Sequence, residues 1–549
     1  MAMHIFLSLI LFSLKAIFIP VQFSDTEFKY GTGDLRAVAD QSSAYFQEQL
    51  HGEGAVEFTM TEPFTLQHPF AYYGRNSQTV HDAKINEAVI EACHAADKDV
   101  DFSECDFIVL LAAGPSEADG AGEDCIWPQQ SFLHEYGKTI SLDGRTLDKF
   151  VVITEIRIDD NGQARFCGIG DLCHETGHIL GLADMYDTDD EGSGGICRGL
   201  WGRTALMDKG NLNDRGWTPP ALNAIDHFQL GTGQCDSLHT GHYELEPVSD
   251  NGKYLAYRSK AGEEIFLFEC RKESGRDAFI GGSGLLIYHL DMRKPDYSAL
   301  WEANKVNCNP EHPCAALLEA EPGTDDIGHI FWPAYNADYF STESGSPFTF
   351  RDGTLPELAL TDIRLNENGN ITFNVIKPLN LYSISCFQDA AIVSWEVSGI
   401  EEKSSEIFLY SGNKEILSMG TGGEHCVTLE DLQPQTYYSV RIKVTDTKDR
   451  KFSIRKEFRT KTYLPEVRPY IYLTGTRRND DGTFESGAKL PLRVFNAVGS
   501  LKTEWYFNSK PIQASAEGYW TVSESGTLKA VIHHQDGSRE TIIKEISVR

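Results

Sequence analysis

Residues 173–184 decide the fold of this chain, and they read Cys173-His174-Glu175-Thr176-Gly177-His178-Ile179-Leu180-Gly181-Leu182-Ala183-Asp184. Residues i and i+4 of a helix share one face, so His174 and His178 can direct two imidazoles at one point. Gly181 tolerates left-handed dihedral angles and would let the chain turn out of the helix. That turn would bring Asp184 round as a third ligand. Two imidazoles and a carboxylate are ligands that zinc takes in catalytic sites.

Glu175 stands next to the first histidine, close enough to accept a proton from a water on the metal. The alternative is an ordinary amphipathic helix with two solvated histidines and a capping glycine. The apolar residues Ile169, Leu172 and Ile179 do fall at helical spacing. That alternative gives no reason for Glu175 and Asp184 to stand where the chemistry needs them. The pattern therefore predicts a zinc hydrolase with Glu175 as its general base.

Length, charge and cysteine content narrow the class of protein. The chain has 549 residues, which is typical of three or four domains. Its formal net charge of -32 argues against nucleic acid or an anionic membrane as a partner. Twelve cysteines are consistent with disulfides formed in an oxidising compartment. The candidate pairs are Cys308 with Cys314, Cys386 with Cys426, and Cys93 with Cys105.

The chain begins with an apolar run, Ile5-Phe-Leu-Ser-Leu-Ile-Leu-Phe-Ser-Leu14. This run suits the core of a signal peptide and is too short to span a bilayer as a helix. The alternative is an apolar N-terminal strand. Taken with the cysteines, the run predicts a signal peptide over residues 1–16 and a secreted, extracellular or cell-surface protein.

Residues 17–232 read as the catalytic domain. We expect helices over residues 34–49 and 80–98, and buried strands over residues 17–22, 106–114 and 150–155. Strands and helices that mix in this order predict an α/β or α+β domain of the zincin or metzincin kind.

Two features follow the zinc motif. Asp187, Asp189 and Asp190 belong to an acidic segment that is either a calcium site, because calcium prefers carboxylate oxygens, or a solvated loop. Met207 lies between Trp201 and Gly210, in a segment rich in turn-forming residues. A methionine in a tight turn after an extended zinc motif is typical of metzincins, where it forms a hydrophobic floor under the metal.

The chain resembles the immune inhibitor A family of secreted bacterial zinc metallopeptidases over roughly residues 17–376. The matching pieces are Phe18-Ile-Pro-Val-Gln-Phe-Ser-Asp25, Ile126-Trp-Pro128, residues 174–187, Trp201 with Met207 and Gly210, residues 220–231, Phe266-Leu-Phe-Glu-Cys-Arg271 and Gly284-Leu-Leu-Ile-Tyr-His-Leu-Asp291. The resemblance implies zinc on His174, His178 and Asp184, with Glu175 as the general base. It also implies a Met-turn at Met207, structural calcium, and protein or peptide substrates.

One feature departs from this family. Its members usually carry a propeptide that blocks the active site. Here the first family-like strand follows the signal-like segment almost directly. We therefore expect either a different form of regulation or an incomplete start of the reading frame.

The rest of the chain reads as β-rich. We expect a β-sandwich packed on the catalytic domain over residues 233–376, a fibronectin type III-like module over 377–463 and an immunoglobulin-like sandwich over 464–549. In the first of these, Glu269, Arg271, His289 and Asp291 lack the spacing of a metal site, so we expect polar pairs in the sheet. The last two modules are either spacers or contacts for a cell surface, matrix or glycan.

Two other hypotheses compete with a secreted zinc endopeptidase. One is a surface adhesin built on a peptidase fold that no longer cuts, and the other is a zinc hydrolase of some other amide or ester. Inactive homologues commonly lose the general base or a ligand, whereas this sequence keeps the whole constellation. We therefore expect an active endopeptidase, and a monomer. Tyr186 is a candidate second stabiliser of the oxyanion, although a packed core tyrosine explains it equally well.

Overall fold

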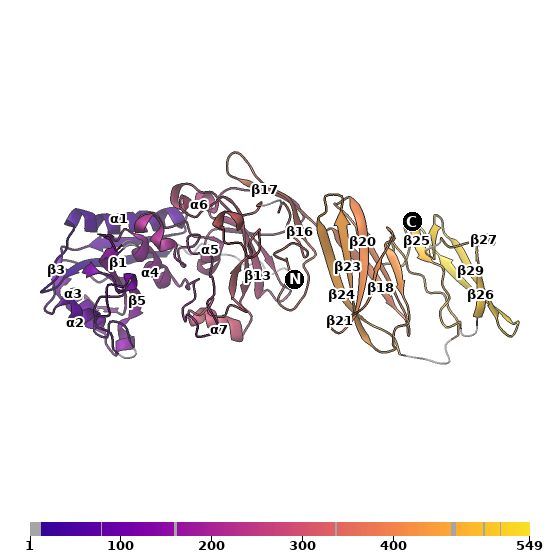
Figure 1. Cartoon of the computed structure of the whole chain (residues 1–549), viewed down its shortest axis with the longest axis horizontal. Helices are drawn as coiled ribbons and strands as arrows, with labels where there is room; N and C mark the ends of the chain where they lie inside the picture. Colours follow the sequence, from indigo (N-terminus) through magenta and orange to yellow (C-terminus); the bar gives the residue numbers. More distant parts are fainter. Residues whose placement is uncertain are drawn as a thin grey trace. The chain divides into compact units, whose positions relative to one another are not determined.

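The structure is a computed structural model that describes residues 12–549 except 78–79, 159–161, 335–336, 463–467, 498–499 and 516–517. The chain divides into two compact units (Figure 1). Unit 1 comprises Met1–Leu238, Tyr243–Asp338 and Ile363–Phe373, and unit 2 comprises His239–His242, Tyr339–Asp362 and Asn374–Arg549. No helix among the described residues is long and apolar enough to cross a membrane.

The first part of unit 1 is organised around a 7-stranded sheet with the order β2-β1-β4-β8-β5. These strands are β2 (Gly54–Met60), β1 (Phe12–Gln22), β4 (Phe107–Pro115), β8 (Lys149–Ile158) and β5 (Gln129–Phe132). The first four pair in parallel, and β5 pairs antiparallel with β8. The short strands β3 (Phe64–Thr65) and β9 (Ala164–Phe166) complete the sheet.

Both faces of this sheet are buried. Successive strand residues belong to two different hydrophobic clusters, as the alternation of side chains requires: Val109 and Leu111 face one way, and Ile108 and Leu110 face the other. Helices α1 (Thr32–Gln49) and α4 (Gly170–Leu180) cover the first face, and α3 (Ile85–Ala96) covers the second. Figure 1 shows α1 and α3 on opposite sides of the strands. The predicted α/β character of the N-terminal region is confirmed.

Two expectations for this region need correction. Residues 12–16 fall within β1, where they pair with β2 and Ala16 is buried, so the predicted boundary after residue 16 cuts through a core strand. Residues 1–11 of the predicted signal peptide lie outside the described residues. The helix expected over residues 80–98 begins only at Ile85, because residues 81–84 form a turn in which Asp82 has a positive φ of 45°.

The core of unit 1 continues past residue 232. A 5-stranded sheet has the order β10-β12-β13-β14-β15, formed by Gln234–Ser237, Lys253–Arg258, Glu264–Arg271, Gly284–Asp291 and Ala315–Leu317. Leu286 and Tyr288 of this sheet belong to the same hydrophobic cluster as Met185 and Met207. The short helices α5 (Ala224–Leu230), α6 (Val248–Asn251) and α7 (Asp296–Glu302) complete this part. A predicted boundary at residue 232 therefore falls inside one shared core.

Residues 374–549 of unit 2 contain four antiparallel sheets. Residues 379–459 form a sheet of order β18-β19-β22 and one of order β21-β20-β23-β24, whose buried residues, Trp395 among them, make one cluster. The first sheet consists of β18 (Leu379–Cys386), β19 (Ala391–Val397) and β22 (Cys426–Leu429). The second consists of β21 (Lys414–Gly420), β20 (Glu402–Ser411), β23 (Tyr437–Asp446) and β24 (Lys451–Arg459).

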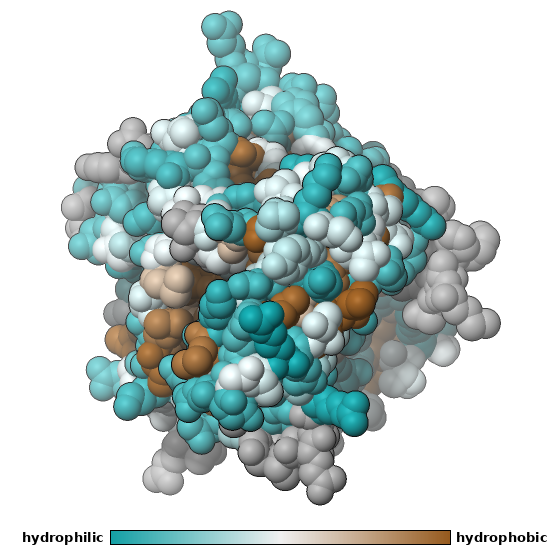
Figure 2. Space-filling view, turned by 90° about the vertical axis from the view of Figure 1, so that its right-hand side faces the viewer, coloured by the Kyte–Doolittle hydropathy of each residue, from teal (hydrophilic) through white to brown (hydrophobic). Residues whose placement is uncertain are grey.

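Residues 488–546 form the sheets β25-β28 and β27-β26-β29-β30 around a separate cluster. The first sheet consists of β25 (Ala488–Pro491) and β28 (Tyr519–Val522). The second consists of β27 (Lys510–Ile512), β26 (Ser500–Phe507), β29 (Gly526–His534) and β30 (Arg539–Ile546). A further sheet, β11-β17-β16 (Gly241–Leu245, Ile371–Ile376 and Ala359–Leu365), has residues assigned to both units. The face of the molecule in Figure 2 is mostly hydrophilic with small, separate hydrophobic patches, as a strongly acidic chain leads one to expect.

All twelve cysteines lie in the described part of the chain, and all are free thiols. The predicted Cys386–Cys426 bond is wrong, because the two residues lie on β18 and β22, on either side of β19. Strands two places apart are roughly 10 Å from one another, too far for a disulfide. The predicted Cys308–Cys314 and Cys93–Cys105 bonds are likewise not formed.

Candidate metal centre

The zinc motif forms helix α4, which ends as the sequence predicts. Its cap, Gly181, has a φ of 100°. The amide of Gly181 donates to the carbonyl of His178 (3.0 Å), and the amide of Leu182 donates to that of Gly177 (3.0 Å). This left-handed cap reverses the chain just beyond the second histidine. Asp184 therefore returns toward the face that carries both imidazoles.

Three side chains converge at this point. The ring atoms Nε2 of His174 and His178 lie 3.1 and 3.4 Å from Oδ1 of Asp184. This carboxylate oxygen is buried and accepts no hydrogen bond. A buried oxygen without a donor is costly unless a cation satisfies it. Two imidazole nitrogens and one carboxylate oxygen within 4.8 Å of one another fit zinc.

Backbone carbonyls fix the orientation of both imidazoles. Nδ1 of His174 lies 2.9 Å from the carbonyl oxygen of Leu206, and Nδ1 of His178 lies 2.9 Å from that of Leu182. A carbonyl only accepts, so each Nδ1 carries the proton and donates it. When the rings are neutral, the lone pair of each is therefore on Nε2, facing Asp184. Hydrogen bonds of this kind hold metal-ligating histidines in the required tautomer.

The electrostatics of the cluster favour a cation. Burial disfavours charge on every member, yet the contact with the carboxylate of Asp184 and the charge of Glu175 raise the pKa of His174 to about 9. The imidazoles of His174 and His178 hold the pKa of Asp184 well below its usual range, against the effect of burial. Without a metal, the cluster therefore holds a proton that a metal would displace.

Glu175 is buried beside this cluster. Burial raises the pKa of its carboxyl, and the neighbouring imidazoles of His174 and His178 oppose that rise. Its position on the helix places the carboxylate next to the first histidine, where the sequence analysis expects the general base.

Met207 packs under the histidine helix. A Cβ placed on Gly177 would lie 2.6 Å from the sulfur of Met207, so the methionine fills the space that a glycine leaves on α4. The carbonyl of Met207 also accepts a hydrogen bond from the amide of Met185 (2.7 Å). Met207 thus supports both the helix and the return segment. The sequence analysis placed this methionine but missed the role of Gly177.

A comparison with known protein families matches the part of the chain that carries this site. Residues 18–213 match the family described as immune inhibitor A peptidase M6, catalytic domain. A relative named Immune inhibitor A, from Bacillus thuringiensis subsp. alesti, is 27% identical over 186 residues. That alignment covers 27% of this chain and 26% of the relative, so the chain spans about a quarter of the relative's length.

Two solved structures each match a short part of the chain. A redesigned β-sandwich protein is 18% identical and covers 16% of this chain and 88% of its own, with a TM-score of 0.14. A human fibronectin type III domain is 17% identical and covers 16% of this chain and 77% of its own, with a TM-score of 0.14. These scores carry no argument about the fold.

Tyr186 lies beside the three candidate metal ligands. Its ring stacks on that of His174, with the centroids 6.3 Å apart and the planes at 24°. Burial and the charges of Asp184 and Glu175 raise its pKa far above the usual value, so the hydroxyl stays protonated. A protonated hydroxyl at this position can donate a hydrogen bond.

The three residues predicted to bind calcium do not come together. Asp187 and Asp189 form a group with the thiol of Cys308, whereas Asp190 is exposed and outside this group. The carboxylate of Asp187 already accepts the amides of Asp189 (3.1 Å) and Cys197 (2.9 Å). A thiol is not an oxygen ligand of the kind that calcium takes. Calcium therefore remains a prediction without support from these residues.

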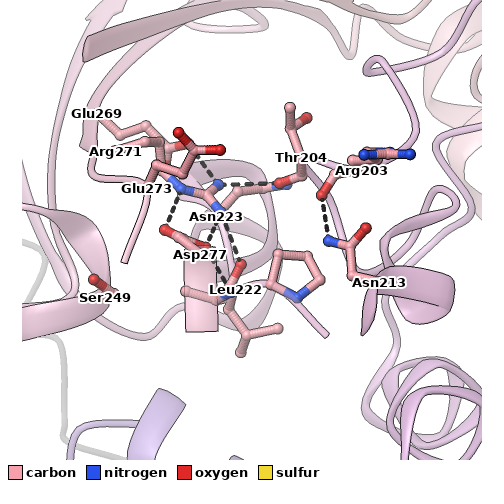
Figure 3. A network of polar contacts seen from close by, with 12 residues as sticks. Arg203, Thr204, Asn213, Leu222, Asn223, Ser249, Glu269, Arg271, Glu273 and Asp277 are labelled. Atoms are coloured by element: carbon pink, nitrogen blue, oxygen red, sulfur yellow. Dashed lines mark hydrogen bonds and ion pairs between the residues drawn. The ribbon is translucent and has the colours of Figure 1, made fainter. Parts of the chain in front are cut away.

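Glu269, Arg271, His289 and Asp291 form polar pairs, as expected. Arg271 is fully buried and pairs with Glu269 (3.1 Å) and Asp277 (2.6 Å). Figure 3 shows its guanidinium between these two carboxylates and pointing also to the carbonyl of Thr204. His289 pairs with Glu264, and Asp291 pairs with Arg293 and His312. The network at Arg271 supports the segment that leads to Met207.

Sequence reasoning also missed Asn304. Its amide group makes two hydrogen bonds with Asp184, one to the backbone and one to the carboxylate. No motif marks this residue, because it stands 120 positions away in the chain.

Proposed function

We propose that this chain is a zinc-dependent endopeptidase that hydrolyses peptide bonds of extracellular proteins. The observation that carries the proposal is the convergence of two Nε2 atoms on a buried carboxylate oxygen that has no donor. The match of residues 18–213 to a peptidase family supports it.

His174, His178 and Asp184 would hold the zinc. Zinc supplies a Lewis acid that lowers the pKa of a water and polarises the substrate carbonyl. Glu175 accepts the proton of the attacking water and then passes it to the leaving amine. Burial favours the protonated form of its carboxyl, which suits the second of these steps. The charge of Asp184 makes the site a weaker Lewis acid than three neutral imidazoles would.

Strand β5 is the proposed docking edge for the substrate. It lies at the end of the sheet, antiparallel to β8, and it contacts α4. An extended peptide can add to such an edge through main-chain hydrogen bonds and so lie along the helix that carries the histidines. Affinity would come from the backbone, and sequence preference from the pockets beside it.

The sheets of residues 379–546 are proposed as fibronectin type III-like and immunoglobulin-like modules of a secreted monomer. The 3-stranded and 4-stranded sheets around Trp395 suit the first of these. Among the described residues of these modules, no cluster of metal-binding side chains occurs. They would act as spacers or as contacts for a cell surface, matrix or glycan.

Hydrolysis of casein by wild type and by Glu175→Ala, each with and without a zinc chelator, tests the proposal. Loss of the general base should lower the rate by about 10²- to 10⁴-fold while zinc stays bound. Chelator should abolish cleavage by wild type. If a folded, zinc-loaded wild type leaves casein and a mixture of other unfolded proteins intact, the proposal is wrong. Cleavage that survives Glu175→Ala at the full rate would refute the assigned general base.

A further inference from the structure

We propose that Asn304 is a positioning residue for the third zinc ligand. This inference rests on the proposed function, since it concerns the same metal centre. The side-chain carbonyl of Asn304 accepts the amide of Asp184 at 2.6 Å. Its side-chain amide donates to Oδ2 of Asp184 at 2.7 Å. One side chain thus holds both the backbone and the carboxylate of Asp184.

The two carboxylate oxygens of Asp184 differ in their hydrogen bonding. Oδ2 is occupied by Asn304, whereas Oδ1 faces the two imidazoles and has no donor. A carboxylate can rotate about its own bond and offer either oxygen, or both, to a metal. The hydrogen bond from Asn304 removes that freedom and leaves one oxygen for zinc. Such outer-shell partners of a ligand commonly change metal affinity by about 10- to 100-fold when they are removed.

The backbone around Asn304 is built to hold this side chain. The residue directly follows the region of α7 and has a φ of 55°, a left-handed conformation that asparagine tolerates better than most residues. Its carbonyl accepts the hydroxyl of Thr188 (2.9 Å). Three residues later, the amide group of Asn307 donates to the carbonyl of Met185 (2.8 Å). The segment therefore holds the chain at Asp184 and at the residues just after it.

This segment lies outside the part that matches the peptidase family, which ends at residue 213. The matched domain supplies the three ligands and the general base. The region after it supplies the residue that orients one ligand. The metal centre is complete only when both are present in the folded protein.

Two substitutions at one position separate positioning from stability. Asn304→Gly removes the side-chain amide and suits a φ of 55°. Asn304→Ala removes the same amide but adds a Cβ in a left-handed conformation, so it should lower the melting temperature further. Asn508→Gly is the matched control. Asn508 also has a positive φ, 46°, and its side chain accepts an amide hydrogen bond from Thr527, far from the metal-binding side chains in sequence.

The experiment measures zinc affinity of the full-length chain by competition with a chromophoric chelator, and melting of the metal-free proteins by circular dichroism. We expect both Asn304 variants to bind zinc about 10- to 100-fold more weakly than wild type, and equally weakly as each other. Asn508→Gly should bind zinc as wild type does. Unchanged affinity in Asn304→Gly, or affinities that follow the melting temperatures of the two variants, would overturn the inference. Failure of wild type itself to bind zinc would instead refute the proposed function.

Discussion

The buried guanidinium of Arg271 gives the sharpest test of how the two parts of unit 1 hold together. Its side chain and those of Glu269 and Asp277 are fully inaccessible to solvent. Arg271→Met keeps the volume and removes the charge, which leaves two carboxylates buried without a cation. Removing one partner of a buried ion pair costs about 3–5 kcal/mol, because the remaining charge is uncompensated.

This cost converts into a measurable shift. The entropy of unfolding grows with chain length, so for a unit as large as unit 1 each kcal/mol lowers the melting temperature by about 1.4 °C. Arg271→Met should therefore melt about 4–7 °C below wild type when the unfolding of unit 1 is followed by calorimetry. Burial raises the pKa of Glu269, and loss of Arg271 should raise it further. The deficit should accordingly shrink as the pH falls and the carboxylates become protonated.

Two further variants make the test specific. Arg75→Met removes an exposed ion pair with Asp124 in the same unit, which should change the melting temperature little because solvent screens the pair. Adding Glu269→Gln and Asp277→Asn to Arg271→Met removes the orphaned charges and should recover much of the lost stability. A melting temperature of Arg271→Met that matches that of Arg75→Met would refute the reasoning, as would a triple variant no more stable than the single one.

Three other predictions follow from the same contacts. The pKa of His174 is raised to about 9, and a bound metal must displace the proton of this residue. Zinc affinity, measured by chelator competition, should therefore rise about tenfold per pH unit between pH 6 and 9. An affinity independent of pH would contradict this prediction. Burial raises the pKa of Asp82 to about 8 in the folded chain, whereas the pKa of the same carboxyl in the unfolded chain is near 3.8. Between these two pH values the folded chain keeps a proton that the unfolded chain has released. The contribution of Asp82 to stability should therefore fall as the pH rises from about 4 to 8, and Asp82→Asn should melt with a weaker pH dependence than wild type over that window. Parallel curves for the two proteins would argue against this prediction. Gly181→Ala adds a side chain at a φ of 100° and should lower stability by about 1–2 kcal/mol, because residues other than glycine are strained in this conformation. The same strain should weaken zinc binding, since this cap returns Asp184 toward the imidazoles. A variant that melts and binds zinc as wild type does would show that the cap tolerates a side chain.

The metal centre could be foreseen from local sequence because its parts lie within one helix and one cap. The spacing of His174 and His178, and the glycine at 181, are consequences of helix geometry alone. Helix α1 was expected over residues 34–49 and is found at Thr32–Gln49, since its amphipathic pattern is long and uninterrupted. The shorter α3 was placed too early, because the turn at Asp82 carries no glycine or proline to mark it.

Long-range contacts explain what the sequence did not reveal. Asn304 reaches Asp184 across 120 positions, and a single asparagine has no spacing that would single it out. The expected disulfide between Cys386 and Cys426 failed for a related reason. Two cysteines in one module look like partners until the strand order places β19 between them. Residues 12–16 have the composition of a signal peptide and also of a buried parallel strand, which periodicity alone does not distinguish.

The catalytic unit extends beyond the family match. Residues 18–213 contain the proposed zinc ligands, the proposed general base and Met207, but the hydrophobic core around them also needs residues from later in the chain. Arg271 donates to the carbonyl of Thr204 just before Met207, and Asn304 holds Asp184. A piece ending near residue 213 would expose the apolar faces that β13 and β14 cover, and it would lose both contacts. The later β-rich region up to residue 338 is therefore a structural part of the metal centre, and variation in that region can tune zinc affinity without touching a ligand.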